Sequence, residues 1–344
     1  MKKSILVIGG TGAQGVPVVK AFASDSEYTI RVLTRSSSSK EANELSALPG
    51  VTIFEGNPYD EPTLCQAIRG MNYIFVNTNG FAIGEKSEIY WGLRMYELAR
   101  EFGVEHFIYA SLEYGSKLGQ FNRKYRCGHL DAKGKVAEFI AAQTTESMAW
   151  SILTSCMYLE GLSEMLRPFP DPGDPGTLVF AAPLGTARCP LIHLEDYGWY
   201  ARWIVGHPTR SNGLNLHVAT EDIGWKDLAV AFTEFTGQKA VYKDVTLDEY
   251  FRLGVFSEPD AKLGHSVDPL DTTLFTYREN FSGFWNVWKD ELTKRDYKLL
   301  DEILPTRVKS VREWMEKVGY SGKPTSILKD YRDNSSRQSG VKVD

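Results

Sequence analysis

The segment Ser4-Ile5-Leu6-Val7-Ile8-Gly9-Gly10-Thr11-Gly12-Ala13-Gln14-Gly15 stands close to the start of the chain. Its residues 5–8 are apolar and partly β-branched, as in a buried parallel strand. The residues after Gly15 carry no turn signal apart from Pro17, which the first turn of a helix tolerates. The glycines therefore lie where a strand turns into a helix.

The spacing Gly9-x-x-Gly12-x-x-Gly15 at that place is typical of dinucleotide binding. One glycine permits the tight turn, one lets the backbone approach a pyrophosphate, and one lets the helix pack on the strand. The positive end of the helix then faces the phosphates. A tight turn without a ligand is the alternative, and it does not explain this glycine spacing. We expect cofactor contacts from Gly9, Thr11, Gly12, Ala13, Gln14 and Gly15.

Length and composition describe an ordinary globular chain. Its 344 residues suffice for one large or two moderate domains, and 42% are hydrophobic and 24% charged. A net charge of −5 argues against a nucleic-acid surface. No apolar run is long enough for a secretory leader or a membrane span, so we expect a cytoplasmic protein without a membrane partner. The four cysteines form no C-x-x-C pair and are expected to be free thiols.

Strand and helix patterns alternate along the first half of the chain, which predicts an α/β fold with a doubly wound parallel sheet. The expected strands cover residues 4–8, 28–33, 51–54, 73–77, 106–110 and 149–153, and the main helices 16–23, 60–69, 87–102 and 131–143. We expect a dinucleotide-binding Rossmann domain over 1–155 and a mixed α/β substrate region over 156–320, parts of which return to the first sheet. The proline-rich stretch 167–176 reads as a linker or a lip over the cleft, and 321–344 as a polar tail.

Ligands of such folds lie at the carboxyl ends of the strands. The second strand ends at Thr34-Arg35-Ser36, where an acidic residue would suit the ribose of NAD and an arginine suits the 2′-phosphate of NADP. The sequence therefore predicts NADPH/NADP⁺ as cofactor, with Arg35 and Ser36 near the extra phosphate. The ends of the next two strands add these expected contacts: Asn57, Asn77, Thr78 and Asn79.

His129 and Lys133 are four residues apart and share one face of the helix after the fifth strand. The pair resembles the Tyr-x-x-x-Lys of extended dehydrogenases, in which Lys holds the nicotinamide ribose and Tyr gives or takes the proton. We expect Lys133 to contact the cofactor and take part in catalysis. His129 is a candidate proton donor, although a helix-face histidine with a structural hydrogen bond is the commoner outcome.

Other polar residues near the expected cleft are candidates for the chemistry. Ser111 ends the fifth strand, and Tyr158 follows the sixth, where it is expected to contact the cofactor as well. The expected substrate contacts are Phe81, Tyr125 and Glu160. Gly-x-Ser-x-Gly is absent, which removes the usual hydrolase elbow. The six histidines show no metal-ligand spacing, so no metal site is expected.

Several motifs together resemble the NmrA-like family of atypical short-chain dehydrogenase/reductases. They are Gly9–Gly15, Thr34-Arg35, Asn77-Thr78-Asn79, Tyr109-Ala-Ser-Leu-Glu113, His129-Leu-Asp-Ala-Lys-Gly-Lys135, Pro190-Leu-Ile-His-Leu-Glu-Asp196 and Val245-Thr-Leu-Asp-Glu-Tyr-Phe-Arg-Leu-Gly254. The resemblance implies a Rossmann domain that binds NADP(H) and a smaller α/β domain that closes a cleft. Two departures from related reductases are Asn57 in place of an acid and Glu160 in place of an amide.

Members of this family are either reductases, often in secondary metabolism, or sensors that bind NADP and regulate a partner protein. Replacing the phenolic Tyr by His129 weakens ordinary carbonyl reduction, because the developing alkoxide needs a proton. An iminium carbon accepts hydride without one. The aromatic residues between Phe275 and Trp288 read mainly as core, yet leave room for a flat, apolar substrate. We therefore expect a reductase of an imine, iminium, carbonyl or enone group in a bulky aromatic molecule; an NADP(H) sensor is the alternative, and homo-oligomerisation is left open.

Overall fold

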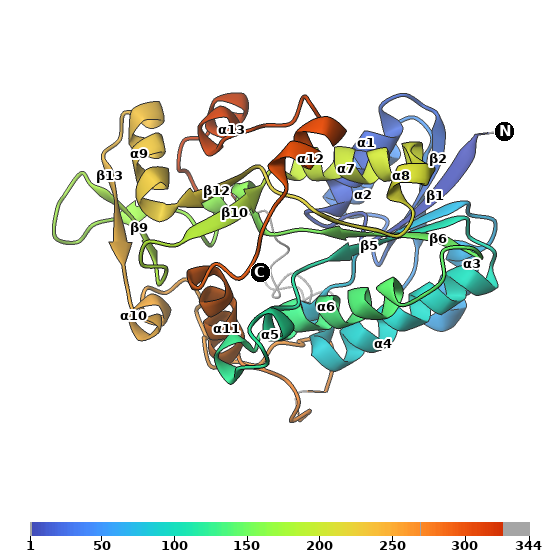
Figure 1. The fold of residues 1–344 in the computed structure, drawn as a ribbon, viewed down its shortest axis with the longest axis horizontal. Coiled ribbons are helices and arrows are strands. Elements are labelled where there is room, and N and C mark those ends of the chain that lie inside the picture. Colours follow the sequence, from blue (N-terminus) through green and yellow to red (C-terminus); the bar gives the residue numbers. More distant parts are fainter. Residues whose placement is uncertain (1, 269, 326–344) are drawn as a thin grey trace.

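The computed structural model of the protein describes residues 2–268 and 270–325. A seven-stranded parallel sheet forms its larger part, in the order β11-β6-β5-β4-β1-β2-β3 (Figure 1). Its strands are β1 (Lys3–Ile8), β2 (Tyr28–Thr34), β3 (Val51–Glu55), β4 (Tyr73–Val76), β5 (His106–Ser111), β6 (Ala149–Thr154) and β11 (Leu214–His217). This order confirms the predicted doubly wound, Rossmann-like fold. Most of the expected polar tail, residues 326–344, lies outside the described residues.

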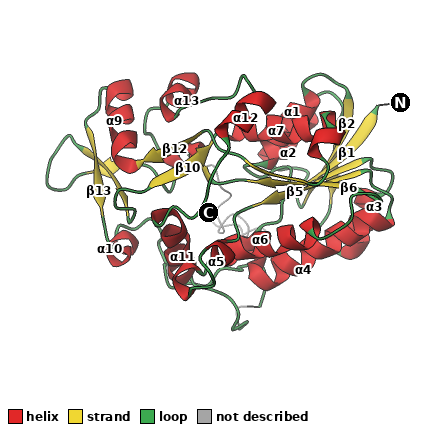
Figure 2. Cartoon of the chain, viewed as in Figure 1, coloured by secondary structure: helices red, strands yellow, loops and turns green. Residues whose placement is uncertain are grey.

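Helices cover both faces of this sheet (Figure 2). On one face lie α1 (Gly15–Ala23), α2 (Lys40–Ser46) and α7 (Leu194–Gly206), with α8 (Pro208–Ser211) beside them. On the other lie α3 (Glu61–Ile68), α4 (Gly80–Glu101) and α6 (Gly128–Ala141), with α5 (Gly115–Leu118) and the 3₁₀ turn η1 (Arg123–Tyr125) following β5.

The apolar residues of β1 explain why both faces are covered. Successive side chains of a strand point to opposite faces. Ile5 and Val7 join the core under α1 and α7, whereas Leu6 and Ile8 join a second core under α3, α4 and α6. All four are at most 1% exposed. A run without polar interruption is therefore what a central strand between two helix layers requires.

The C-terminal half adds two small sheets. One consists of β12 (Glu221–Gly224), β10 (Arg188–Ile192) and β7 (Met157–Tyr158), which leads into the 3₁₀ turn η2 (Leu159–Ser163). The other consists of β13 (Ala240–Asp244), β9 (Leu178–Ala182) and β8 (Phe169–Pro170). Their helices are α9 (Trp225–Thr236), α10 (Leu247–Arg252), α11 (Tyr277–Lys289), α12 (Tyr297–Ile303) and α13 (Val311–Val318). The proline-rich stretch 167–176 thus contributes one short edge strand.

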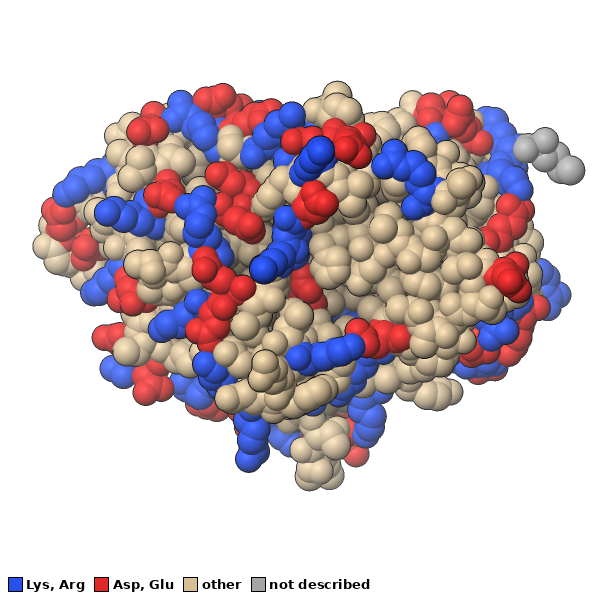
Figure 3. All heavy atoms as spheres, in the orientation of Figure 1, with Lys and Arg blue, Asp and Glu red and all other residues tan. Residues whose placement is uncertain are grey.

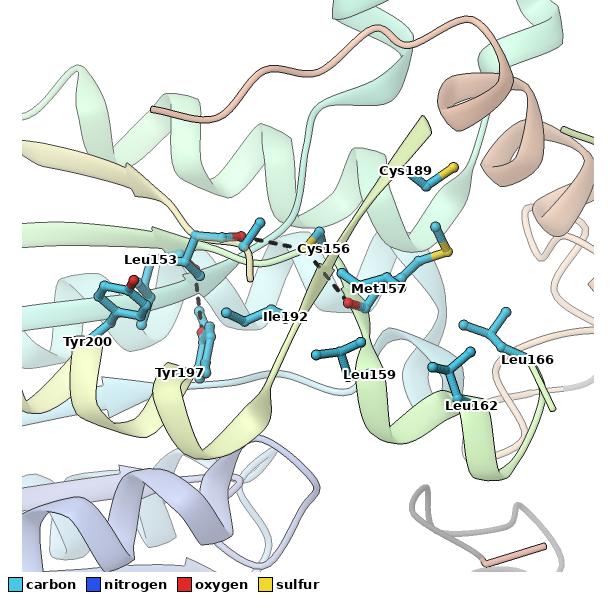
Figure 4. Packing of buried hydrophobic residues seen from close by; sticks show 14 of the residues in the cluster. Leu153, Cys156, Met157, Leu159, Leu162, Leu166, Cys189, Ile192, Tyr197 and Tyr200 are labelled. Atoms are coloured by element: carbon cyan, nitrogen blue, oxygen red, sulfur yellow. Dashed lines mark hydrogen bonds between the residues drawn. The ribbon is translucent and has the colours of Figure 1, made fainter. Parts of the chain in front are cut away.

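One hydrophobic core joins the two halves of the chain. Figure 4 shows Leu153 of β6, Ile192 of β10 and Tyr197 of α7 packed around a shared space with Leu159 and Leu162 of η2. The Tyr197 hydroxyl donates to the Leu153 carbonyl oxygen over 3.4 Å. The elements after the sixth strand are therefore packed against the Rossmann sheet, and β11 pairs directly with β6.

Some element boundaries differ from those predicted. The helix expected over 87–102 begins at Gly80, because Asn79 caps it, and it bends at Gly84, where φ is +71°. The aromatic stretch after Phe275 forms α11, which the Thr276–Glu279 capping box starts. Strands β9 and β12 were not predicted. The latter is only Glu221-Asp-Ile-Gly224, too short and polar for its sequence to indicate a strand.

The surface and the thiols agree with a globular chain. On the face in Figure 3, basic and acidic side chains are interspersed, and no region of a single charge sign covers it. Over the described ranges, no helix has the length and apolar character that crossing a bilayer would require. All four cysteines, each of them described, are free.

We predict that Gly198→Ala destabilises the fold by weakening the contact between α1 and α7. An alanine Cβ at this position would lie 2.4 Å from the Pro17 carbonyl oxygen on α1, and backbone on both sides leaves little room to adjust. We expect a loss of about 1–3 kcal/mol in the free energy of unfolding, measured by urea denaturation. Gly206→Ala at the end of the same helix is the control, because its Cβ would meet only the tip of Arg202 at 3.4 Å. Equal stability of the two variants would contradict the prediction.

Candidate functional site

The glycine segment forms a narrow cradle between β1 and α1. Gly9 has a φ of +78°, and a Cβ there would lie 2.6 Å from the Asn77 carbonyl oxygen. A Cβ at Gly15 would lie 2.1 Å from the Gly9 carbonyl oxygen, so the helix could not begin this close to the strand with any other residue. Within the described residues, the Gln14 side chain makes no capping hydrogen bond to α1. The backbone N–H groups at the start of α1 are thus arranged as an anion site, which fits the diphosphate of a dinucleotide.

A pocket of about 620 Å³ opens at this cradle, a volume typical of ligand sites. It runs from the glycine loop along the first turns of α1 to the beginning of α7. Its lining includes Thr11, Gly12, Ala13, Lys20, Glu41, Glu160, His193, Glu195 and Trp199. The diphosphate end of the expected cofactor site is therefore accessible from outside.

The ends of β2 and β3 lie beside the cradle. Thr34 at the end of β2 shares a hydrogen bond of 3.3 Å with the Thr11 hydroxyl, which ties the loop of Arg35 and Ser36 to the glycine segment. Arg35 is exposed and Ser36 half-buried. Asn57 is exposed after β3, and its side chain accepts from the Tyr59 N–H over 3.0 Å. This arrangement brings the loop of Arg35 and Ser36 next to the glycine segment at the carboxyl end of β2, and the phosphate contact expected of Arg35 stays a prediction.

Lys133 is buried, and its ammonium group joins α6 to the ends of β4 and β5. Its Nζ lies 3.0 Å from Asn77 Oδ1, 3.0 Å from the Thr78 carbonyl oxygen and 3.3 Å from the Ala110 carbonyl oxygen. Glu88 Oε1 lies 3.2 Å away, and the Tyr109 ring is 5.6 Å from Nζ. The predicted cofactor lysine is thus also the structural centre of the loop that carries Asn77, Thr78 and Asn79.

Glu88 is the countercharge of this lysine and was not predicted from the sequence. Its side chain on α4 is fully buried and accepts from the Thr78 hydroxyl over 2.8 Å. Burial raises the pKa of the Glu88 carboxyl and lowers the pKa of the Lys133 ammonium, and their mutual attraction opposes both shifts. The sequence signal that could have indicated a buried Glu88 is the position of this residue in α4. Glu88 stands between Gly84 and Gly92 in the buried stripe of α4, where a carboxylate needs a partner.

His129 lies one turn before Lys133, in a cage of aromatic rings. Phe81, Phe281 and Phe284 lie with their ring centroids 4.8, 5.7 and 5.7 Å from the imidazole. Burial lowers the pKa of His129 to about 4. An imidazole with this pKa is uncharged at neutral pH and is not a Brønsted acid there.

The other predicted side chains are distributed around this centre. Ser111 Oγ lies 3.0 Å from the Leu112 carbonyl oxygen and 3.3 Å from that of Lys133. The Tyr125 hydroxyl donates to Asp290 Oδ2 over 2.8 Å, on the side of η1 that faces α11. Tyr158 in β7 is half-buried, and burial raises the pKa of its phenol. Phe81 forms a triangle of rings with His129 and Phe281, with its centroid 4.8 Å from the imidazole and 6.1 Å from the Phe281 ring.

Glu160 holds the start of α7 beside the glycine loop. Its Oε1 accepts from His193 Nδ1 over 2.7 Å and from the Leu194 N–H over 3.0 Å, so it acts as a cap. Burial alone would lower the pKa of His193, but the Glu160 carboxylate outweighs it and raises that pKa. Glu160 Oε2 is buried and has no hydrogen-bond partner among the described residues. The expected substrate contact thus lines the pocket from the side of α7.

Asn280 is the second functional residue that the sequence did not indicate directly. It is fully buried on α11, in the stripe that also holds Phe281 and Phe284, and its side chain contacts His129. A polar residue inside an aromatic stripe is the signal that could have found it. Among the residues that the structure describes, no cluster of His, Cys, Asp or Glu has the arrangement of a metal site.

Comparisons with known proteins agree with this fold. The model of the NmrA-like family matches residues 1–304. An oxidoreductase with an NmrA-like domain from Aspergillus hancockii is 28% identical over 273 residues, which cover 75% of this chain and 80% of the relative. The crystal structure of NmrA, a negative transcriptional regulator, in complex with NADP has a TM-score of 0.72 at 19% identity and covers 92% of this chain and 95% of that one. An NADPH-dependent quinone oxidoreductase of Escherichia coli, complexed with NADPH, has a TM-score of 0.68 at 16% identity, with 92% and 100% covered.

We predict that Glu88→Ala lowers the free energy of unfolding by about 3–5 kcal/mol, because it leaves the Lys133 ammonium buried without a countercharge. Chemical denaturation monitored by circular dichroism measures the loss. Glu97→Ala on the same helix is the control. Glu97 is half-buried, and its carboxylate makes only a partly exposed ion pair with Arg100 at 3.6 Å, so its removal is expected to cost at most about 0.5 kcal/mol.

A double variant, Glu88→Leu with Lys133→Met, tests the cause of this loss. It removes both charges, so it should be more stable than Glu88→Ala alone. If Glu88→Ala proves as mild as Glu97→Ala, the pair does not hold the loop in the way described.

Proposed function

The chain belongs to the NmrA-like family, and on that premise we propose that it is an NADPH-dependent reductase. The proposed substrate is a bulky aromatic small molecule with a C=N, C=O or enone group. The observation that carries the proposal is that the glycine cradle and the aromatic cage of His129 meet at one edge of the sheet. The loop from Asn77 to Phe81 contacts the glycine cradle through Asn77 and the aromatic cage of His129 through Phe81. Dinucleotide and flat apolar ligand would then lie side by side.

The chain's own residues have distinct roles in this proposal. The N–H groups at the start of α1 bind the diphosphate, and Arg35 with Ser36 binds the 2′-phosphate. Lys133 and its partners fix Asn77 and Thr78, the loop on which the nicotinamide ribose would rest. When bound, the reduced nicotinamide supplies a hydride equivalent. The aromatic rings of the His129 cage exclude water from the reacting group.

The proposed substrate class follows from what the site lacks at neutral pH. His129 is uncharged, and the Ser111 hydroxyl is directed to backbone carbonyl oxygens. A carbonyl that becomes an alkoxide needs a proton from such groups, whereas an iminium carbon does not. A neutral imine joins this class only after it is protonated to the iminium ion, because hydride addition to a neutral C=N bond also creates an anion. We therefore place iminium ions, and imines that are protonated in solution, first among the acceptors, ahead of enones and simple carbonyls. The relatives named as oxidoreductases, and the resemblance to reductases of secondary metabolism, support a role of this kind.

A regulatory protein that binds NADP(H) and a partner protein is the second candidate. The fold shared with a negative transcriptional regulator bound to NADP, and the engagement of Lys133 with five protein acceptors, favour it. A partner captured only with NADPH present, or only without it, would support this reading. An enzyme without a regulatory role should show no such dependence.

We predict that Arg35→Ala weakens NADPH binding about 10- to 100-fold and leaves NADH binding nearly unchanged. A charge-assisted hydrogen bond to phosphate is worth about 1.5–3 kcal/mol, and NADH has no 2′-phosphate. Isothermal titration calorimetry of both nucleotides gives the two dissociation constants. A parallel loss for NADH, or tighter binding of NADH by the natural chain, would contradict the NADP(H) assignment.

We predict NADPH consumption with cyclic imines or iminium salts of aromatic scaffolds, followed at 340 nm for NADPH. Turnover should be slower with matched ketones, for the reason given above. Gly15→Val serves as the control, because its side chain would fill the cradle and abolish nucleotide binding. Tight NADPH binding without turnover of any imine, enone, quinone or ketone would favour the regulatory candidate.

A further inference from the structure

The amide of Asn280 has one orientation that satisfies its neighbours. Its Oδ1 lies 3.4 Å from the His129 backbone nitrogen and 3.7 Å from Cys127 Sγ, both of which are donors. Its Nδ2 lies 2.8 Å from His129 Nδ1. Turning the amide over would place its NH₂ group against the His129 N–H and lose that bond. Because the side chain is fully buried, no bulk water compensates for such a loss.

This orientation determines the protonation of the imidazole. An amide nitrogen is only a donor, so His129 Nδ1 must accept from it. Cys127 Sγ lies 3.3 Å from Nδ1 and 4.0 Å from Nε2, and its one hydrogen is directed to Asn280 Oδ1, so the amide alone supplies the donor to Nδ1. A proton on Nδ1 would bring two donor hydrogens together across 2.8 Å. Both the imidazolium ion and the Nδ1–H tautomer are therefore disfavoured, which leaves the neutral ring with its proton on Nε2.

The surroundings of the ring agree with a neutral form. From α4 it meets Phe81, and from α11 it meets Asn280, Phe281 and Phe284, none of which is charged. On its own helix, Asp131 and Lys133 act on it with opposite signs. The ring is thus held by hydrogen bonds and apolar contacts, without a counterion.

We propose that Asn280 is a positioning residue that fixes His129 as the neutral Nε2–H tautomer, so that the site offers its ligand an uncharged N–H donor. The assignment of this donor to substrate binding rests on the proposed function; the tautomer itself does not. An uncharged donor of this kind can orient a lone pair on a C=O oxygen or on a neutral imine nitrogen, whereas an iminium nitrogen has no lone pair to accept from it. It does not repel a cationic substrate as an imidazolium would.

The tautomer can be read directly by NMR on the full chain labelled with ¹⁵N-histidine. Spectra that correlate ring nitrogens and carbons separate protonated from unprotonated nitrogens, and a His129→Gln sample identifies the signals of His129. We expect an unprotonated Nδ1, a protonated Nε2 and no titration between pH 5.5 and 8. A protonated Nδ1, or a titration midpoint near 6.5, would overturn the proposal. The tautomer is read from the natural chain, and only the assignment of its signals uses the His129→Gln variant.

Asn280→Asp tests the role of Asn280 in particular. A carboxylate accepts where the amide donated, so Nδ1 should gain a proton and the His129 titration should move up by at least two pH units. Asn286→Asp on the same helix is the matched control. Asn286 donates to the Lys124 carbonyl oxygen over 2.8 Å, away from His129, and its substitution should leave the titration unchanged. A folded Asn280→Asp protein whose His129 remains uncharged at pH 7 would overturn the assignment.

The same variants separate this inference from the proposed function. If the natural chain reduces an imine, its kcat should be flat between pH 6 and 8, and Asn280→Asp should introduce an ionisation in that range. Absence of turnover with every acceptor, together with the expected NMR signals, would remove the reductase and keep the tautomer. Turnover together with a His129 that titrates in this range would keep the reductase and remove the tautomer assignment.

Discussion

A lysine ammonium group buried between α6 and two strand ends is the constraint on which the site depends. An ammonium is costly to remove from water, and it remains buried only where acceptors and a countercharge surround it. Lys133 meets this condition with the oxygens of Asn77, Thr78 and Ala110 and with the carboxylate of Glu88. Satisfying the charge therefore determines where the ends of β4 and β5, the start of α4 and the middle of α6 lie relative to one another.

The loop after β4 is held from its other side by the glycine cradle. The Asn77 N–H donates to the Ile8 carbonyl oxygen over 3.2 Å, and only a glycine at position 9 leaves room for the Asn77 carbonyl. Asn79 then caps α4 and donates its own N–H to the Tyr59 hydroxyl. A loop fixed on both sides is preorganised, which lowers the entropic cost of binding a ligand there.

Local chemistry explains what could be predicted from the sequence. The apolar run before Gly9 and the spacing of the glycines depend on neighbours in the chain, so they indicated the strand, the helix and the cradle, and the sheet order confirmed the fold. The role expected of Arg35 rests on the same kind of local pattern and stays a prediction. Glu88 and Asn280 could not, because their meaning lies in partners 45 and 151 residues away, Lys133 and His129. The only sequence signal that could have indicated the burial of these two polar side chains is the helical spacing of their apolar neighbours.

The charged groups differ between the diphosphate end and the aromatic end of the site, and this difference affects which hydride acceptor the site would suit. At the proposed diphosphate end, the start of α1 offers backbone N–H groups, and the pocket lining carries both Lys20 and carboxylates such as Glu41 and Glu160. At the aromatic end, Glu88 balances Lys133, and His129 is uncharged, so that end carries little net charge to stabilise a new anion. Hydride addition to a neutral carbonyl creates an anion, whereas addition to an iminium ion removes a charge. For the proposed reductase, a buried and nearly neutral aromatic end therefore favours the reaction that leaves no charge behind.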